Sequence, residues 1–160
     1  MTLMKEMKTK LTHLDEQGRA KMVDVGRKDL ISRKAIAEGK LFLSPQTGEV
    51  IRKAGLPKGN PFEVARLAGI QAAKLTSQLI PLCHNLNLDL VDVQIELQEE
   101  GFHIRSEVSC RGATGVEMEA LAAVSVAALT LYDMCKAVDK EMTLGEIRLV
   151  EKTKGVTVNQ

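Results

Sequence analysis

The stretch VDVQIELQEEGFHIRSEV, residues 91–108, decides the fold of this chain. Apolar and polar residues alternate from 91 to 97, which is typical of a strand with one buried and one solvated face. Residues 99–101 form a turn signal, and the alternating pattern resumes at Phe102. The stretch therefore predicts an antiparallel hairpin.

Long helical patterns lie on both sides of the hairpin. Apolar residues recur every three or four positions over 62–80, after a proline-containing loop at 56–61 and before Pro81, which predicts a helix. After a glycine-rich link at 110–115, residues 116–138 predict a second helix. This helix is apolar almost all round, so we expect the sheet to cover one side and, as a hypothesis, another subunit to cover a second side.

Two short apolar runs, 41–43 and 147–150, predict further strands. Ser44 followed by Pro45 is typical of a helix start, and Gly55 of its end. The resulting order is strand, helices, strand, strand, helix, strand. This order predicts an α+β fold, a ferredoxin-like sandwich in which two long helices cover one face of an antiparallel sheet.

The N-terminal part predicts additional helices on the same sandwich. Residues 29–38 show near-helical spacing of apolar residues before Gly39, a helix stop signal, and 23–26 is a candidate short strand. Residues 1–10 and 153–160 are expected to be a flexible arm and a flexible tail. The length of 160 residues predicts one domain covering the whole chain.

Charge and composition exclude several functional classes. The net charge is +1 and aromatic residues make up 2%, which argues against a globally basic nucleic-acid or membrane binder. The charge is nevertheless segregated: residues 1–40 hold ten Lys plus Arg against six acids, while 85–101 hold five acids and no Lys or Arg. The longest weakly polar run, 121–132, is shorter than the roughly 20 residues that span a bilayer, and no signal peptide is evident, so a cytoplasmic location is expected.

Cationic or protonatable candidates lie in two loops. Lys58 precedes a helix N-terminus, where it could neutralise a phosphate, although a solvated loop lysine fits the pattern as well. His84 follows the helix stop at Pro81 and could exchange protons near neutral pH. Its neighbour Cys83 is a poor candidate nucleophile, because adjacent residues of an extended segment point to opposite sides.

Carboxylates mark both ends of the helix at 116–138. Glu117 and Glu119 lie at its start, where they suit the helix dipole. Asp133 and Lys136 share a face near its end, as a surface ion pair or as functional groups among apolar neighbours. Glu119 and Asp133 are 14 residues apart, about 21 Å along a helix, so a site that uses both must lie between subunits.

Three long strings carry a resemblance to a known family: THLDEQGRAKMVDVG (12–26), ARLAGIQAAKLTSQLIPLCH (65–84) and GVEMEALAAVSVAALTLYDMCKAVDK (115–140). They closely resemble the molybdenum cofactor biosynthesis protein C family, the cyclic pyranopterin monophosphate synthases. The resemblance extends from about Leu11 to Lys152.

The resemblance implies a phosphorus–oxygen lyase that converts 3′,8-cyclo-7,8-dihydroguanosine 5′-triphosphate into cyclic pyranopterin monophosphate and pyrophosphate. It implies a ferredoxin-like homohexamer, a trimer of dimers, with active sites between subunits. The substrate is a small molecule, so no nucleic acid or membrane partner is expected. No cofactor is expected to be required, and whether Mg²⁺ accompanies the triphosphate stays open.

The resemblance also implies the site residues. The expected catalytic residues are the proton-transferring Lys58 and Lys136, with Asp133 orienting Lys136. The expected substrate-binding residues are Asp24, Arg33, Leu82, Cys83, His84, Glu117, Met118, Glu119 and Lys152. Cations in this set would stabilise the departing pyrophosphate, and Glu117 and Glu119 would hold the guanine-derived edge.

Two departures from the family pattern stand out: Asn60-Pro61 replaces Asp and Val after Lys58-Gly59, and the tail after Lys154 lacks the usual glycine-rich, lysine-containing sequence. Two alternative functions stay open. A catalytically silent binding protein of the same fold would not need the polar set, and a general nucleotide hydrolase would need a phosphate loop or metal cluster that the sequence does not show. The three histidines show no metal-ligand spacing, so no metal site is expected.

Overall fold

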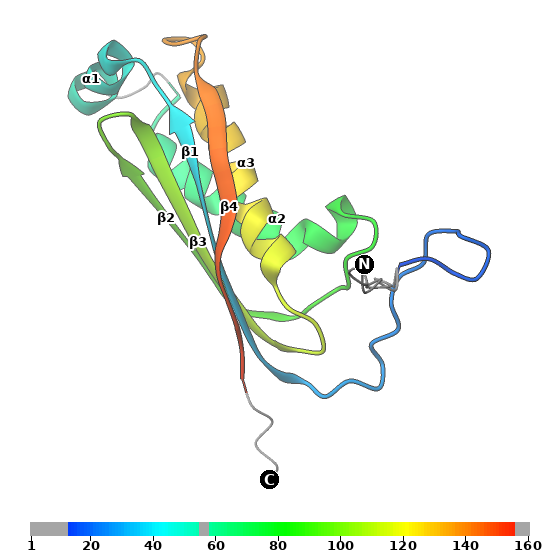
Figure 1. Cartoon of the computed structure of the whole chain (residues 1–160). Helices are drawn as coiled ribbons and strands as arrows, with labels where there is room; N and C mark the ends of the chain where they lie inside the picture. The colour runs from blue at the N-terminus through cyan, green and yellow to red at the C-terminus, as the bar shows by residue number, and fades with distance from the viewer. Residues whose placement is uncertain (1–12, 55–57, 156–160) are drawn as a thin grey trace, which may run out of the picture.

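The computed structural model describes residues 13–54 and 58–155. A four-stranded antiparallel sheet, in the order β2-β3-β1-β4, carries α2 and α3 on one face (Figure 1). The elements in chain order are β1 (Ile31–Phe42), α1 (Pro45–Ala54), α2 (Pro61–Leu79), β2 (Leu88–Leu97), β3 (Gly101–Gly112), α3 (Glu117–Cys135) and β4 (Thr143–Lys154). The α+β class and the antiparallel sheet are as predicted, and the arrangement is consistent with a ferredoxin-like sandwich.

The hairpin predicted from residues 91–108 is present as β2 and β3. Its strands pair antiparallel from Leu97 opposite Phe102 to Leu88 opposite Cys110. Gly101 adopts a φ of 140°, a conformation that favours glycine, at the turn. The predicted glycine-rich link at 110–115 is shorter than expected, because β3 continues to Gly112.

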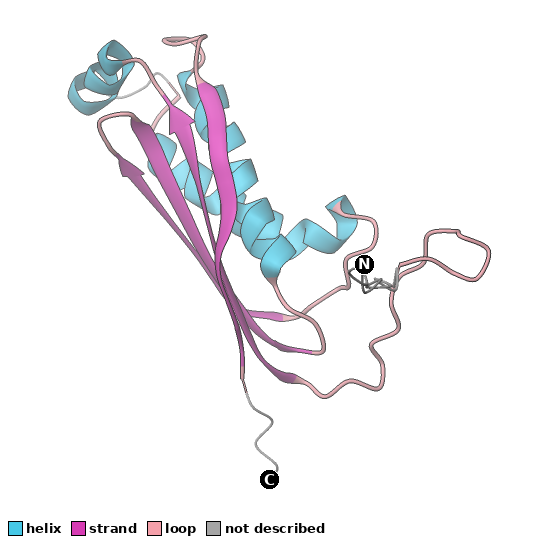
Figure 2. Cartoon of the chain, viewed as in Figure 1, coloured by secondary structure: helices cyan, strands magenta, loops and turns pink. Residues whose placement is uncertain are grey.

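The two long helices pack against each other as well as on the sheet (Figure 2). At the start of α2 the Asn60 side chain accepts hydrogen bonds from the backbone N–H groups of Phe62 (3.0 Å) and Glu63 (3.4 Å). Asparagine therefore caps this helix as an aspartate could, and Pro61 suits its first position. Both helices were predicted, and α3 ends three residues earlier than expected, at Cys135.

The helix predicted over 29–38 is wrong, because these residues belong to β1 and to the end of the loop before it. Ile31 and Ala35 face the helices, while Ile36 is buried on the other side of the sheet. A strand with buried residues on both faces does not alternate cleanly, and its apolar residues happen to fit helical spacing. The predicted strand at 23–26 is also wrong, since this segment is a loop. Within residues 13–44 no helix is present, so the additional N-terminal helices are not confirmed.

Gly39 lies within β1 instead of ending a helix. A Cβ added there would lie 2.6 Å from Cγ1 of Val124 in α3 and 3.0 Å from Cγ1 of Ile147 in β4. The glycine thus permits close approach of the helix to the strand.

The C-terminal strand is longer than the predicted 147–150. Because β4 runs from Thr143 to Lys154, the expected flexible tail at 153–160 is wrong for Thr153 and Lys154. The remaining residues of that tail from 156 onward, and the arm predicted at 1–10, lie outside the described residues.

In the described part of the chain, α3 is long and apolar enough by length and composition to cross a membrane. Half of its apolar stretch is buried against the sheet and α2, which is typical of a core helix. Met118 and Leu129 nevertheless remain exposed on its outer side.

Candidate active site

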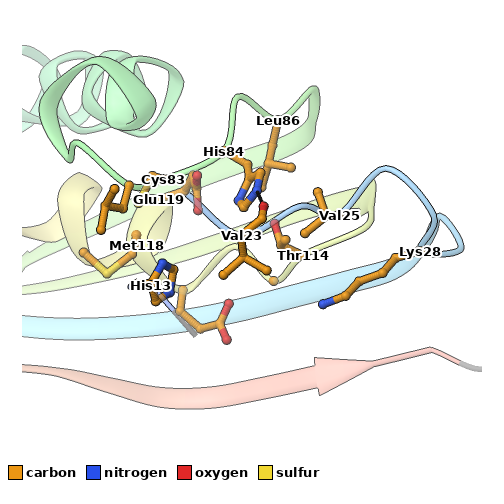
Figure 3. A pocket seen from close by; sticks show the side chains of 13 residues that line it. His13, Val23, Val25, Lys28, Cys83, His84, Leu86, Thr114, Met118 and Glu119 are labelled. Atoms are coloured by element: carbon orange, nitrogen blue, oxygen red, sulfur yellow. Dashed lines mark hydrogen bonds between the residues drawn. The ribbon is translucent and has the colours of Figure 1, made fainter. Parts of the chain in front are cut away.

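A cleft of about 520 Å³ lies between the N-terminal segment, the loop after α2 and the start of α3 (Figure 3). It brings together six of the predicted substrate-binding residues: Leu82, Cys83, His84, Glu117, Met118 and Glu119. Seven further residues line it that the sequence did not single out: His13, Val23, Val25, Lys28, Leu86, Thr114 and Gly115. Several of these lie in or beside the family-like strings, which was the available signal for them.

His84 holds the N-terminal segment against the cleft through a hydrogen bond. Its Nε2 lies 2.6 Å from the carbonyl oxygen of Val23, and Figure 3 shows the ring pointing at that carbonyl. Because a carbonyl only accepts, Nε2 carries the proton. Asp24, on the same segment, does not line the cleft; its Oδ1 accepts from the Gly26 N–H at 2.9 Å, which stabilises the local turn.

Two predicted cations organise the start of α3. Lys152, brought alongside by β4, forms an ion pair with Glu117. Burial raises the pKa of the Glu117 carboxyl, but the Lys152 ammonium and nearby backbone N–H outweigh this effect and lower it overall. Arg33 donates to the carbonyls of Gly112 (3.2 Å) and Ala113 (3.1 Å), so part of its hydrogen-bonding capacity holds the link before α3.

Glu119 has the opposite electrostatic environment. Only 5% of the residue is exposed, and burial, with a smaller contribution from the Glu117 charge, raises the pKa of its carboxyl. Two carboxylates with opposite shifts in one cleft are suited to different proton-transfer roles. Burial and the Glu119 charge also raise the pKa of the Cys83 thiol, which disfavours a thiolate nucleophile there.

The three predicted catalytic residues form a second cluster at the far end of α3. Asp133 accepts from Lys136 Nζ through Oδ1 at 2.7 Å and from Lys58 Nζ through Oδ2 at 2.8 Å. Hydrogen bonds from Lys136 and Lys58 lower the pKa of Asp133 to about 2. In return, Asp133 raises the pKa of Lys136, the opposite of the lowered pKa expected for a lysine general base.

One chain does not bring the two clusters together. Glu119 and Asp133 lie near opposite ends of α3, about 21 Å apart along its axis. The cleft holds neither Lys58, Asp133 nor Lys136. The separation expected from the sequence is therefore present in the fold.

A family model and the similar known proteins all indicate the same family. A model described as the MoaC family matches residues 22–155. A cyclic pyranopterin monophosphate synthase of Chloroflexus aurantiacus is 53% identical over 154 residues, covering 95% of this chain and 94% of the relative. The synthase of Parvibaculum lavamentivorans is 55% identical over 148 residues, covering 91% and 92%.

A third relative is longer than this chain. The molybdenum cofactor biosynthesis bifunctional protein of Chlorobaculum tepidum is 56% identical over 144 residues. The match covers 90% of this chain but 46% of the relative, so the chain spans less than half of that bifunctional protein.

Proposed function

The chain belongs to the MoaC family, and on this premise we propose that it is a cyclic pyranopterin monophosphate synthase of molybdenum cofactor biosynthesis. The observation that carries the proposal is the identity of 53% and 55% to two synthases over nearly their full length. The substrate is the 3′,8-cyclised dihydroguanosine triphosphate, and the products are cyclic pyranopterin monophosphate and pyrophosphate. In this reaction the enzyme acts as a phosphorus–oxygen lyase.

The cleft supports binding of a polar, phosphorylated substrate. Lys28 and His84 line it, and Lys152 and Arg33 lie beside its acidic residues. Cations next to a departing pyrophosphate stabilise the negative charge that develops on it. Glu119, which burial keeps closer to its neutral form, can donate a hydrogen bond to the guanine-derived edge.

Lys58, Asp133 and Lys136 supply the proton transfers. Asp133 holds Lys136 in its charged form, so Lys136 acts first as a proton donor. For Lys136 to accept a proton, substrate or a second subunit must displace the Asp133 carboxylate from it. Such displacement lowers the pKa of Lys136, because it removes the group that raises this pKa.

The assembly we propose is a homohexamer, a trimer of dimers, with each active site between subunits. The outer sides of α2 and α3 support it, since Val64, Leu67 and Leu129 are exposed there without a cover in the single chain. Joining the cleft of one chain to the Asp133 cluster of another completes the site. The proposed location is cytoplasmic, with no nucleic-acid or membrane partner.

We propose that the enzyme requires no resident cofactor; Mg²⁺ can enter with the triphosphate. Both alternatives have weaker support. A silent binding protein has no use for the Lys58–Asp133–Lys136 cluster. A general nucleotide hydrolase would need a phosphate loop, which the sequence lacks, or a metal-binding cluster, which the described residues do not contain.

The deciding experiment incubates the purified protein with the cyclised triphosphate and, separately, with GTP. We expect equimolar pterin product and pyrophosphate from the first substrate and no turnover of GTP. Lys136→Ala should lower kcat by about a hundredfold or more, because it removes a proton-transfer group. Lys53→Ala, which changes an exposed lysine on α1, is the control and should leave kcat unchanged. GTP turnover, or full activity of Lys136→Ala, contradicts the proposal.

A further inference from the structure

Asp139 is a buried carboxylate that belongs neither to the cleft nor to the Lys58–Asp133–Lys136 cluster. It lies in the loop after α3 and is 9% exposed. Its Oδ2 accepts hydrogen bonds from the Ser44 backbone N–H (3.1 Å) and the Thr47 hydroxyl (2.9 Å), and its Oδ1 accepts from the Glu141 N–H (2.9 Å). Both carboxylate oxygens therefore have partners in the fold.

Two of these partners belong to a distant part of the chain. Ser44 and Thr47 lie at the start of α1, more than ninety positions before Asp139. Thr47 is 3% exposed, and its hydroxyl also lies 2.9 Å from the Ser44 hydroxyl. Asp139 thus joins the N-terminus of α1 to the loop after α3 through a partly buried polar network, in which the hydrogen bond from Thr47 is buried.

This joint has catalytic candidates on both sides. On one side, α3 ends at Cys135, with Asp133 in its last turn and Lys136 immediately after it. On the other side, α1 ends at Ala54, four positions before Lys58. Lys58 Nζ reaches across to Asp133, 2.8 Å from Oδ2 and 3.0 Å from the carbonyl oxygen.

The Lys58–Asp133 contact is too exposed to hold the two segments together by itself. Its side chains are 47% and 55% exposed, and ion pairs of this kind contribute little because water and salt screen them. Hydrogen bonds to a charged group are stronger when they are removed from water, as the one from Thr47 to Asp139 is, and leaving a buried partner unpaired is costly. The Asp139 joint is therefore a stronger link between the start of α1 and the end of α3 than the Lys58–Asp133 ion pair.

We propose that Asp139 is a positioning residue of the active site, which sets the place of Lys58 relative to Asp133 and Lys136. This inference rests on the proposed function only for its effect on turnover. The geometric part, the Lys58–Asp133 contact, is measurable without substrate.

The joint depends on the charged form of Asp139. Hydrogen bonding from the Ser44 N–H, opposed by burial and reinforced by Glu141 and Thr47, lowers the pKa of the Asp139 carboxyl. An asparagine with its oxygen in the place of Oδ2 keeps the bonds from Ser44 and Thr47 only as uncharged, weaker hydrogen bonds, and its NH2 group then faces the Glu141 N–H. Asp139→Asn accordingly weakens the joint, although asparagine is almost the same size.

The test compares Asp139→Asn, Thr47→Val and the matched control Thr47→Ser in the full-length protein. Thr47→Val removes the hydroxyl and keeps the shape, whereas Thr47→Ser keeps the hydroxyl. We expect kcat for the cyclised triphosphate to fall ten- to a hundredfold in the first two variants, because small misplacements of catalytic groups cost this much. KM should change less than threefold, and Thr47→Ser should resemble the wild type.

An NMR titration of the Asp133 carboxyl supplies the second measurement. Displacing Lys58 should raise the Asp133 pKa above about 2 in Asp139→Asn and Thr47→Val, but not in Thr47→Ser. A merely structural role would lower thermal stability and leave this pKa in place. If Asp139→Asn does not fold, Thr47→Val decides.

Each outcome bears on the proposal. An unchanged Asp133 pKa in the folded variants overturns it, whether or not kcat falls. A raised pKa with unchanged kcat overturns the catalytic part. If the wild type itself does not turn over the cyclised triphosphate, the proposed function fails, and the titration still decides whether Asp139 positions Lys58.

Discussion

Glu117 and Glu119 lie two positions apart at the start of α3, and their surroundings push their titration in opposite directions. The Lys152 ammonium outweighs the burial of Glu117 and lowers the pKa of its carboxyl, whereas burial and the Glu117 charge raise the pKa of the Glu119 carboxyl. Their residue types and the helix start are readable from the sequence. The difference between them is not, because Lys152 reaches Glu117 only through the pairing of β4 with β1.

These opposite shifts predict opposite pH profiles of stability. The pKa of Glu119 is raised in the folded state, so ionising this carboxyl above its ordinary pKa of 4.5 disfavours folding. Glu119→Gln should therefore stabilise the protein more at pH 7 than at pH 4. Glu117 has a lowered pKa, and its favourable contribution is lost as pH falls below 4.5. Glu117→Gln should therefore destabilise at pH 7 and less at pH 4.

Urea unfolding of both variants across pH 4–8 checks this prediction, with the wild type as reference. Parallel profiles for the two variants would contradict it. Both substitutions should also lower kcat/KM for the cyclised triphosphate by about a hundredfold, because we propose that these carboxyls hold its guanine-derived edge.

His84 predicts a local effect on the N-terminal segment. His84→Ala removes the hydrogen bond to the Val23 carbonyl, and a net loss of about 1 kcal/mol corresponds to roughly fivefold faster local opening. Hydrogen exchange of residues 20–28, measured by mass spectrometry, should rise by about that factor. Exchange in β2 and β3 is the internal control, and an equal rise there would indicate general destabilisation instead.

At the scale of elements, the sequence predicted the hairpin and the long helices because each of them has a local cause. Alternation over 91–97 reflects one solvated face of the strand, and two adjacent residues, Asn60 and Pro61, are enough to mark the start of α2. Only the end of β1 was predicted, as the short strand at 41–43. The rest was missed because its cause is not local: β1 lies between β3 and β4, and Ile36 is buried on the face away from the helices. Helical spacing at 29–38 was a coincidence of that double burial.

Gly39 makes the packing of α3 on β1 testable. In Gly39→Ala the new Cβ would lie 2.6 Å from Val124 Cγ1, so the helix or the strand must shift, and we expect a loss of about 1–3 kcal/mol in the free energy of unfolding. Gly48→Ala in α1 is the matched control. Its added Cβ has its nearest contact at 3.4 Å, with the flexible end of Arg52, and should stabilise by about 0.5–1 kcal/mol. Urea denaturation measures both, and equal effects would contradict the close approach.

At the scale of the whole molecule, the near-neutral charge conceals an uneven distribution. The open face of the sheet pairs its own charges, for example Glu38 with Arg105 at 2.9 Å and Lys34 with Glu107 at 3.1 Å. The outer side of the helices instead exposes Leu67 and Leu129. Burying charges that are already paired gains little free energy, whereas burying exposed apolar side chains is favourable. Subunits should therefore meet through the helical layer.

The separation of the two clusters predicts complementation between inactive subunits. Glu119→Gln and Asp133→Asn should each abolish most activity alone. If every active site combines the cleft of one chain with the Asp133 cluster of another, oligomers refolded from an equal mixture contain intact sites at about a quarter of positions. Activity should then return to about a quarter of the wild-type value. Leu67→Glu places a charge on the helical layer. It should abolish both the recovery of activity and the oligomer, which sedimentation measures. If the mixture forms intact oligomers but recovers no activity, the shared active site is refuted, because the cleft and the Asp133 cluster of different chains then do not act together.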